Sequence, residues 1–99
     1  MQITTSEENG HTLLAIEGRL DTNTAPQLEE AAGALFDAAK NNIVVDLGAC
    51  DFVSSAGLRV IVAMQKRVMT GGSLAFSNVQ AEVMDVFEMT GFNKLLTFE

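Results

Sequence analysis

The sequence is poor in the residues that most often carry chemistry. Its single cysteine, Cys50, excludes an internal disulfide and an all-thiolate metal site. Its single histidine, His11, follows a predicted turn, and no serine, base and carboxylate form a recognisable triad around it. The carboxylates are spaced as on solvated helix faces, without the His or Cys neighbours of a tight metal site. We therefore expect no catalytic group, no cofactor and no metal, and a protein that is not an enzyme.

Basic residues are also scarce: the chain has 6 Lys and Arg against 13 Asp and Glu, a net charge of −7. Nucleic acid binding depends on neutralising phosphates with cations, so we expect no nucleic acid partner and favour a protein partner. No apolar run approaches the roughly 18 residues of a membrane span, which argues against membrane insertion. The N-terminal residues lack the basic and apolar regions of a signal peptide, so the expected location is cytoplasmic.

The remaining composition, 47% hydrophobic over 99 residues, predicts one domain with one core, spanning residues 1–99. Alternating patterns predict strands over residues 3–6 and 12–20, joined at Asn9-Gly10 by a hairpin turn. Thr24-Ala25-Pro26-Gln27 resembles a capping box with proline in the first turn of a helix. Apolar residues follow it at helical spacing: Leu28, Ala32, Leu35, Phe36 and Ala39.

The second half of the chain alternates between strands and helices. Residues 43–47 form a β-branched apolar run typical of a central strand, and residues 73–77 a further strand. Helices are predicted over residues 56–70, ending at Gly71-Gly72, and over residues 79–90, ending at Gly91, with a short edge strand over residues 92–98. This order predicts an α/β fold: a mixed sheet of four to five strands with helices packed mainly on one face.

The segment Asp51 to Arg59 places two hydroxyls between a buried strand and the start of a helix. Free N–H groups and the dipole at a helix start favour an anion there, so Ser54-Ser55 is typical of a phosphorylation switch rather than a catalytic site. Serine is also a leading N-cap residue, which by itself explains one of the pair. Gly57 is costly inside a helix, by roughly 1 kcal/mol against alanine, and suggests close approach of another backbone.

A helical wheel divides the helix after the double serine into two faces. The face expected in the core comprises Leu58, Ile61, Val62, Gln65, Val68 and Met69. The face expected in solvent comprises Arg59, Ala63, Lys66, Arg67 and Thr70. Val60 and Met64 fall on the far side of the core stripe, next to Arg67, where they are expected to be exposed. They either contact a partner or are scattered exposed apolar residues of the ordinary kind.

Several of these segments together resemble one known family, the STAS-domain anti-sigma factor antagonists of bacterial partner-switching systems. Gly18-Arg19-Leu20-Asp21-Thr22 resembles an early G-x-L-D segment, Val45-Asp46-Leu47 a central V-D-L strand, and Ser54-Ser55-Ala56-Gly57-Leu58 the signature loop. In many members the loop is D-S-[ST]-G-L, and aligning Gly57-Leu58 with its G-L places the phosphorylated serine at Ser55. Ser54 then replaces the common aspartate, and Ala56 the second hydroxyl residue.

The resemblance implies a switch. The unmodified protein would bind an anti-sigma factor that is also a serine protein kinase, phosphorylation of Ser55 would break the complex, and a serine phosphatase of the PP2C type would restore it. The implied partner face comprises Asp21, Thr22, Asn23, Ser54, Ala56, Gly57, Arg59, Val60 and Met64. Two alternatives stay open: a constitutive STAS subunit of a transporter complex such as a lipid-transport ATPase, and an enzyme or nucleotide-binding module, for which the sequence offers no phosphate cradle.

Overall fold

The computed structural model describes residues 1–99, and its elements follow the predicted order. They are β1 (Gln2–Glu8), β2 (His11–Leu20), α1 (Ala25–Asp37), β3 (Asn42–Val53), α2 (Ser55–Val68), β4 (Ser73–Ser77), α3 (Ala81–Thr90), a 3-10 turn (Phe92–Lys94) and β5 (Thr97–Phe98). None of the helices combines the length and the apolar character needed to cross a membrane.

The five strands form one mixed sheet in the order β1-β2-β3-β4-β5, which confirms the predicted fold class and the central place of β3. Strands β1 and β2 are antiparallel, and the other neighbours are parallel. The hairpin turn has φ values of 49° at Asn9 and 86° at Gly10. Two consecutive left-handed residues match the right-handed twist of the flanking strands, which is why an Asn-Gly pair predicts this turn.

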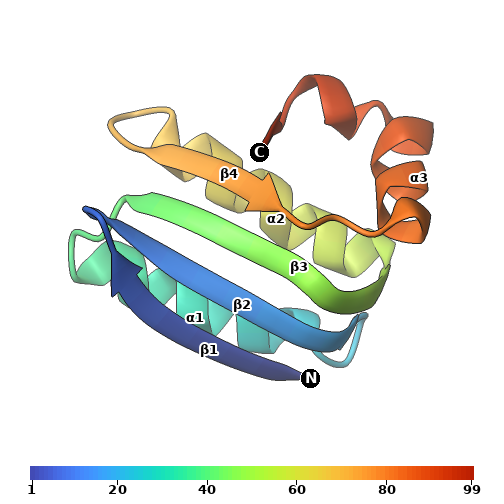
Figure 1. The fold of residues 1–99 in the computed structure, drawn as a ribbon, viewed down its shortest axis with the longest axis horizontal. Helices are drawn as coiled ribbons and strands as arrows, with labels where there is room; N and C mark the ends of the chain where they lie inside the picture. Colours follow the sequence, from blue (N-terminus) through green and yellow to red (C-terminus); the bar gives the residue numbers. More distant parts are fainter.

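All three helices cover the same face of the sheet, as predicted. Figure 1 shows α1 and α2 behind the strands, with no helix in front of β1 to β3. Leu14, Val45 and Phe76 are paired across β2, β3 and β4 and therefore point to one face, where all three are buried. The ring of Phe87 in α3 lies 6.0 Å from that of Phe76, which places α3 on this face too. A core of 22 buried residues lies between the sheet and the helices.

The largest departures from the prediction occur at element ends. Strand β3 runs on to Val53, well past the predicted end at residue 47, and its register with β2 shifts at two places. Such bulges break the alternation from which strand ends are predicted. Helix α3 begins only at Ala81, because Asn78 has a left-handed φ of 56° and its amide donates to Asp46. Of the residues predicted as an edge strand, Phe92–Lys94 form a 3-10 turn and only Thr97–Phe98 pair as β5.

The predicted capping box at the start of α1 is wrong. Thr24 does occupy the N-cap position, but its side chain makes no capping hydrogen bond. Its hydroxyl instead accepts from the Asp21 N–H at 2.8 Å and donates to the Arg19 carbonyl at 2.8 Å. The Gln27 amide reaches the Met1 carbonyl at 3.2 Å and not the cap. The threonine therefore stabilises the loop before α1.

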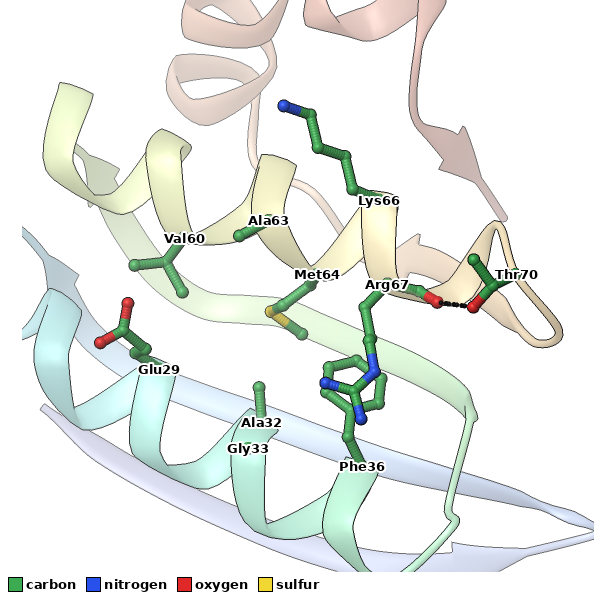
Figure 2. A pocket seen from close by; sticks show the side chains of 10 residues that line it. All are labelled: Glu29, Ala32, Gly33, Phe36, Val60, Ala63, Met64, Lys66, Arg67 and Thr70. Atoms are coloured by element: carbon green, nitrogen blue, oxygen red, sulfur yellow. Dashed lines mark hydrogen bonds between the residues drawn. The ribbon is translucent and has the colours of Figure 1, made fainter.

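The predicted exposure of Val60 and Met64 is also wrong. Val60 is 8% exposed and Met64 3%, and both point from α2 towards α1 (Figure 2). Met69, expected in the core, is 70% exposed. Helix α2 packs against the sheet on one side and against α1 on the other, so its buried arc is displaced towards α1. A helical wheel shows where apolar residues lie but not which neighbouring element covers them.

Gly33, in the interior of α1, has no packing role within the chain. A Cβ at this position would meet no atom within 4 Å. Because glycine in a helix loses more backbone entropy on folding than alanine, Gly33→Ala should raise the free energy of unfolding by roughly 0.5–1 kcal/mol. Urea denaturation followed by circular dichroism measures this change. A variant less stable than the parent would contradict the open space at Gly33.

Candidate functional site

The double serine lies where two loops meet at the carboxyl ends of β2 and β3. Strand β2 ends at Leu20 and β3 at Val53, and the two residues are paired in the sheet. The Ser54 N–H donates to the Leu20 carbonyl at 2.8 Å, which joins the start of α2 to the end of β2. The loop from Asp21 to Thr24 therefore lies beside the N-terminus of α2.

The two serines have different environments. Ser54 is the N-cap of α2: its Oγ accepts from the Gly57 N–H at 3.3 Å, and its carbonyl accepts from the Leu58 N–H at 2.9 Å. Ser55 is the first residue of the helix, is exposed, and its hydroxyl forms no hydrogen bond within the chain. One serine thus holds the helix start, and the other presents a free hydroxyl to solvent.

Gly57 is in close contact with Leu20. A Cβ at position 57 would lie 2.6 Å from Leu20 Cγ and 3.0 Å from the Leu20 carbonyl oxygen. The close approach predicted from this glycine is therefore present, and it comes from within the chain. It allows the first turn of α2 to sit directly on the end of β2.

Asp21 organises the loop before α1. Its Oδ1 accepts from the Asn23 N–H at 3.0 Å and from the Thr24 N–H at 3.1 Å, and Thr24 Oγ1 lies 3.2 Å away. Partial burial by itself would raise the pKa of Asp21, but the hydrogen bonds from Thr24 and Asn23 and the charge of Arg19 outweigh it and lower the pKa. The carboxylate is thus held ionised and fixes the loop beside Ser55.

Replacing Asp21 with asparagine should lower the melting temperature near neutral pH, because a neutral amide is a weaker acceptor for these N–H groups. The folded-state pKa lies below the unfolded one, so the stabilisation is complete above the unfolded pKa and is lost as the pH falls through the folded pKa. The difference in Tm between the two proteins should therefore shrink below about pH 3.9. Thermal denaturation from about pH 7 down to about pH 2.5 measures it. A difference that does not depend on pH would contradict this role.

The structure gathers most of the predicted partner face at this end of the molecule. Asp21, Thr22 and Asn23 lie on the β2–α1 loop, and Ser54 through Gly57 begin α2. Arg59 is exposed one helical turn further along. Gly57, Val60 and Met64 do not project with these residues, because all three are buried, Gly57 against Leu20 and the other two towards α1. The part that each residue plays in partner binding stays a prediction.

Two residues at the same end were not predicted from the sequence, Phe52 and Arg19. Phe52 is 37% exposed, and the Arg19 guanidinium lies 4.1 Å from the centroid of its ring, a cation–π contact. The two residues are paired across β2 and β3. An exposed aromatic residue two positions before the serine pair is suited to contact a protein partner. The Phe52 side chain points outward because the register between β2 and β3 shifts in this part of the sheet. The alternation of residues in the sequence does not reveal such shifts.

A hollow of about 480 Å³ opens on the α3 side of α2 and extends from Ser55. It is lined by Ser55, Arg59, Val62, Lys66, Thr90 and Phe92, among others. The exposed serine hydroxyl is therefore reachable from solvent along a partly apolar surface that carries two cations. No group of three or more potential metal-ligating side chains is present in the structure.

Comparison with known proteins identifies relatives of this chain. The family model of the STAS domain matches residues 2–99. The anti-sigma factor antagonist BtrV of Bordetella bronchiseptica is 33% identical over 93 residues, which cover 93% of this chain and 80% of BtrV. The anti-sigma-F factor antagonist RsfB of Mycobacterium tuberculosis is 35% identical over 77 residues, or 78% of this chain. The match spans 62% of RsfB, less than two thirds of its length.

Solved structures share the fold. A crystal structure from Thermotoga maritima, described as an anti-sigma factor antagonist, has a TM-score of 0.87 and 20% identity, covering 97% of this chain and 84% of that chain. The unphosphorylated antagonist SpoIIAA has a TM-score of 0.81 and 17% identity, covering 99% of this chain and 88% of its own. SpoIIAA of Bacillus has also been solved in a phosphorylated form, with a TM-score of 0.72 and 15% identity over 99% of this chain and 91% of its own. The chain belongs to the STAS domain family, together with the anti-sigma factor antagonists to which it is similar.

Proposed function

We propose that this protein is an anti-sigma factor antagonist controlled by phosphorylation of Ser55. The observation that carries the proposal is the division of roles between the two serines. Ser54 is occupied as the cap of α2, whereas the Ser55 hydroxyl is exposed and unbonded at the first helical position. A kinase needs a hydroxyl that it can reach, and Ser55 offers one.

In this proposal the unphosphorylated form binds an anti-sigma factor that is also a serine protein kinase, and thereby releases the sigma factor. The docking surface would include the half-buried Asp21 and the exposed residues around Ser55, which are Thr22, Asn23, Arg59 and Phe52. Both curated relatives described above are named as anti-sigma factor antagonists, which supports this class of partner. Neither is described as a transporter subunit, so the constitutive-subunit alternative has less support.

Phosphorylation would oppose docking through charge. A phosphoserine adds about −1.5 to −2 charges at neutral pH, to a chain that already carries a net charge of −7. The ionised Asp21 lies on the adjoining loop, so a partner surface that fits the neutral site would face added repulsion and desolvation. The N-terminus of α2 would stabilise the phosphate in the free protein. A serine phosphatase of the PP2C type would then restore the binding form, and the chain itself would catalyse no reaction.

A pair of alanine variants tests the assignment. Incubation with the candidate serine kinase and ATP, followed by mass spectrometry, should place one phosphate on Ser55. Ser55→Ala should lose the phosphate and still bind the kinase, because the hydroxyl makes no contact that holds the fold. Ser54→Ala is the matched control: it should still be phosphorylated but lose about 0.5–2 kcal/mol of stability with its cap. Full phosphate incorporation on Ser55→Ala would exclude the proposal.

A further inference from the structure

A cation lies one helical turn after the exposed serine. Ser55 is the first residue of α2 and Arg59 lies four positions further along, so their Cβ atoms are neighbours about 5–6 Å apart on one face of the helix. Side chains of a helix lean towards its N-terminus, so the stem of Arg59 leads back towards Ser55. Both residues line the hollow of about 480 Å³ described above. An anion carried by Ser55 would therefore meet the guanidinium of Arg59.

Arg59 has no other partner within the chain. It is exposed, and its guanidinium takes part in no hydrogen bond, salt bridge or cation–π contact. Arg19, at the same end of the molecule, is already engaged: its Nε lies 3.8 Å from Asp21 Oδ2 and its guanidinium 4.1 Å from the centroid of the Phe52 ring. Arg59 can thus turn to a new anion without losing a contact, and Asp21 already has a cation beside it.

Of the two cations that line the hollow, only Arg59 is within reach of Ser55. The lining includes no acidic residue, and its second cation is Lys66. Lys66 lies about three turns further along α2 than Ser55, or roughly 16 Å along the axis, which is too far for a phosphate to bridge. Figure 2 shows Arg67 on the other side of the helix, where its guanidinium lies 5.0 Å from the centroid of the Phe36 ring.

We propose that Arg59 binds the phosphate of phosphorylated Ser55 and is thereby withdrawn from the docking surface. The order of the pair is the favourable one, because an anion N-terminal to a cation at this spacing agrees with the helix dipole. A guanidinium can also donate two parallel N–H groups to phosphate oxygens. Phosphorylation then changes the docking surface twice, since it adds negative charge and occupies an exposed cation. This inference rests on the proposed phosphorylation of Ser55.

The test uses the full 99-residue chain with phosphoserine inserted at position 55 during translation, so that no kinase is required. ³¹P NMR measures the second pKa of the phosphate, which is about 6 for a phosphoserine without a partner. A nearby cation favours the dianion and lowers this pKa. In Arg59→Gln the phosphate pKa should therefore be higher than in the parent phosphoprotein by about 0.3 or more. Arg59→Lys should recover part of the difference, because it keeps the charge but not the planar guanidinium.

Arg67→Gln is the matched control, because it removes the same charge from the same helix on the side that faces α1. It should change the phosphate pKa by less than about 0.1, since screening weakens interactions over such a distance. The Nε–H resonances in ¹H–¹⁵N spectra give a second readout: that of Arg59 should shift on phosphorylation and that of Arg67 should not. Raising the salt concentration to about 300 mM should reduce the effect of Arg59→Gln, because the pair is exposed. Thermal denaturation shows that each variant is folded.

Three results would overturn the proposal. They are equal phosphate pKa values in the parent and Arg59→Gln, equal effects of Arg59→Gln and Arg67→Gln, and an Arg59 Nε–H that does not respond to the phosphate. If Lys66→Gln raised the pKa more than Arg59→Gln did, the phosphate would lie deeper in the hollow and the assignment to Arg59 would be wrong. None of these results decides whether a kinase modifies Ser55. A kinase that leaves Ser55 unmodified would overturn the proposed function, whatever contacts the translated phosphoserine makes.

Discussion

Replacing Gly57 with alanine is expected to lower the free energy of unfolding by about 1–3 kcal/mol, although alanine is the better helix former. The added Cβ would lie 2.6 Å from Leu20 Cγ, closer than such atoms approach in folded proteins, and 3.0 Å from the Leu20 carbonyl oxygen, which is tighter than most such contacts. Leu20 is fully buried, so its side chain has little room to move away. Its carbonyl also accepts the Ser54 N–H, and displacing it would loosen the start of α2.

Urea denaturation measures this loss, and the same substitution at Gly33 is its control. Both glycines lie in helices, but Gly33 faces open space, so Gly33→Ala should stabilise where Gly57→Ala destabilises. In a Leu20→Ala background the effect of Gly57→Ala should become smaller, because most of the clash involves the leucine side chain. If Gly57→Ala were as stable as the parent in both backgrounds, the contact with Leu20 would not constrain α2.

The features predicted correctly from the sequence are those that depend on local residue chemistry. The Asn9-Gly10 turn follows from two residues that tolerate positive φ, and the central place of β3 from a β-branched apolar run. The position of the double serine at the start of a helix follows from the helical spacing of the residues after it, whereas the predicted end of the preceding strand, at residue 47, is too early. The resemblance to a known family added the early Asp21 segment, which the structure places on the loop beside the serines.

The features that were predicted wrongly, or not predicted, depend on contacts between distant elements. The burial of Val60 and Met64 is decided by α1, which packs on a side of α2 that a helical wheel assigns to solvent. Phe52 points outward because the register of β3 against β2 shifts before it is reached. Thr24 has the composition of a cap, but the Arg19 carbonyl and the Asp21 N–H compete for its hydroxyl. Helix-capping propensity does not include these alternative hydrogen-bond partners, because they come close to Thr24 only in the folded protein.

Replacing Ser55 with glutamate is expected to raise the Kd for the anti-sigma partner at least about 100-fold, or roughly 2.7 kcal/mol. An interface that closes over the neutral hydroxyl would have to bury an unpaired carboxylate, and such a charge costs several kcal/mol when no partner group compensates it. The free protein should not suffer. A carboxylate in the first turn of α2 interacts favourably with the helix dipole, by about 0.3–1 kcal/mol.

Glutamine at the same position separates charge from size, because its side chain has the same shape and no charge. If charge controls docking, Ser55→Gln should bind the partner at least about tenfold more tightly than Ser55→Glu, a difference of about 1.4 kcal/mol. Isothermal titration calorimetry with the purified anti-sigma factor measures both, and denaturation shows that both variants are folded. If both substitutions weakened binding of the anti-sigma factor equally, the size of the side chain at position 55 and not its charge would control docking. If Ser55→Glu bound the partner as tightly as the parent, the partner would dock away from Ser55. Negative charge at the start of α2 would then not control binding.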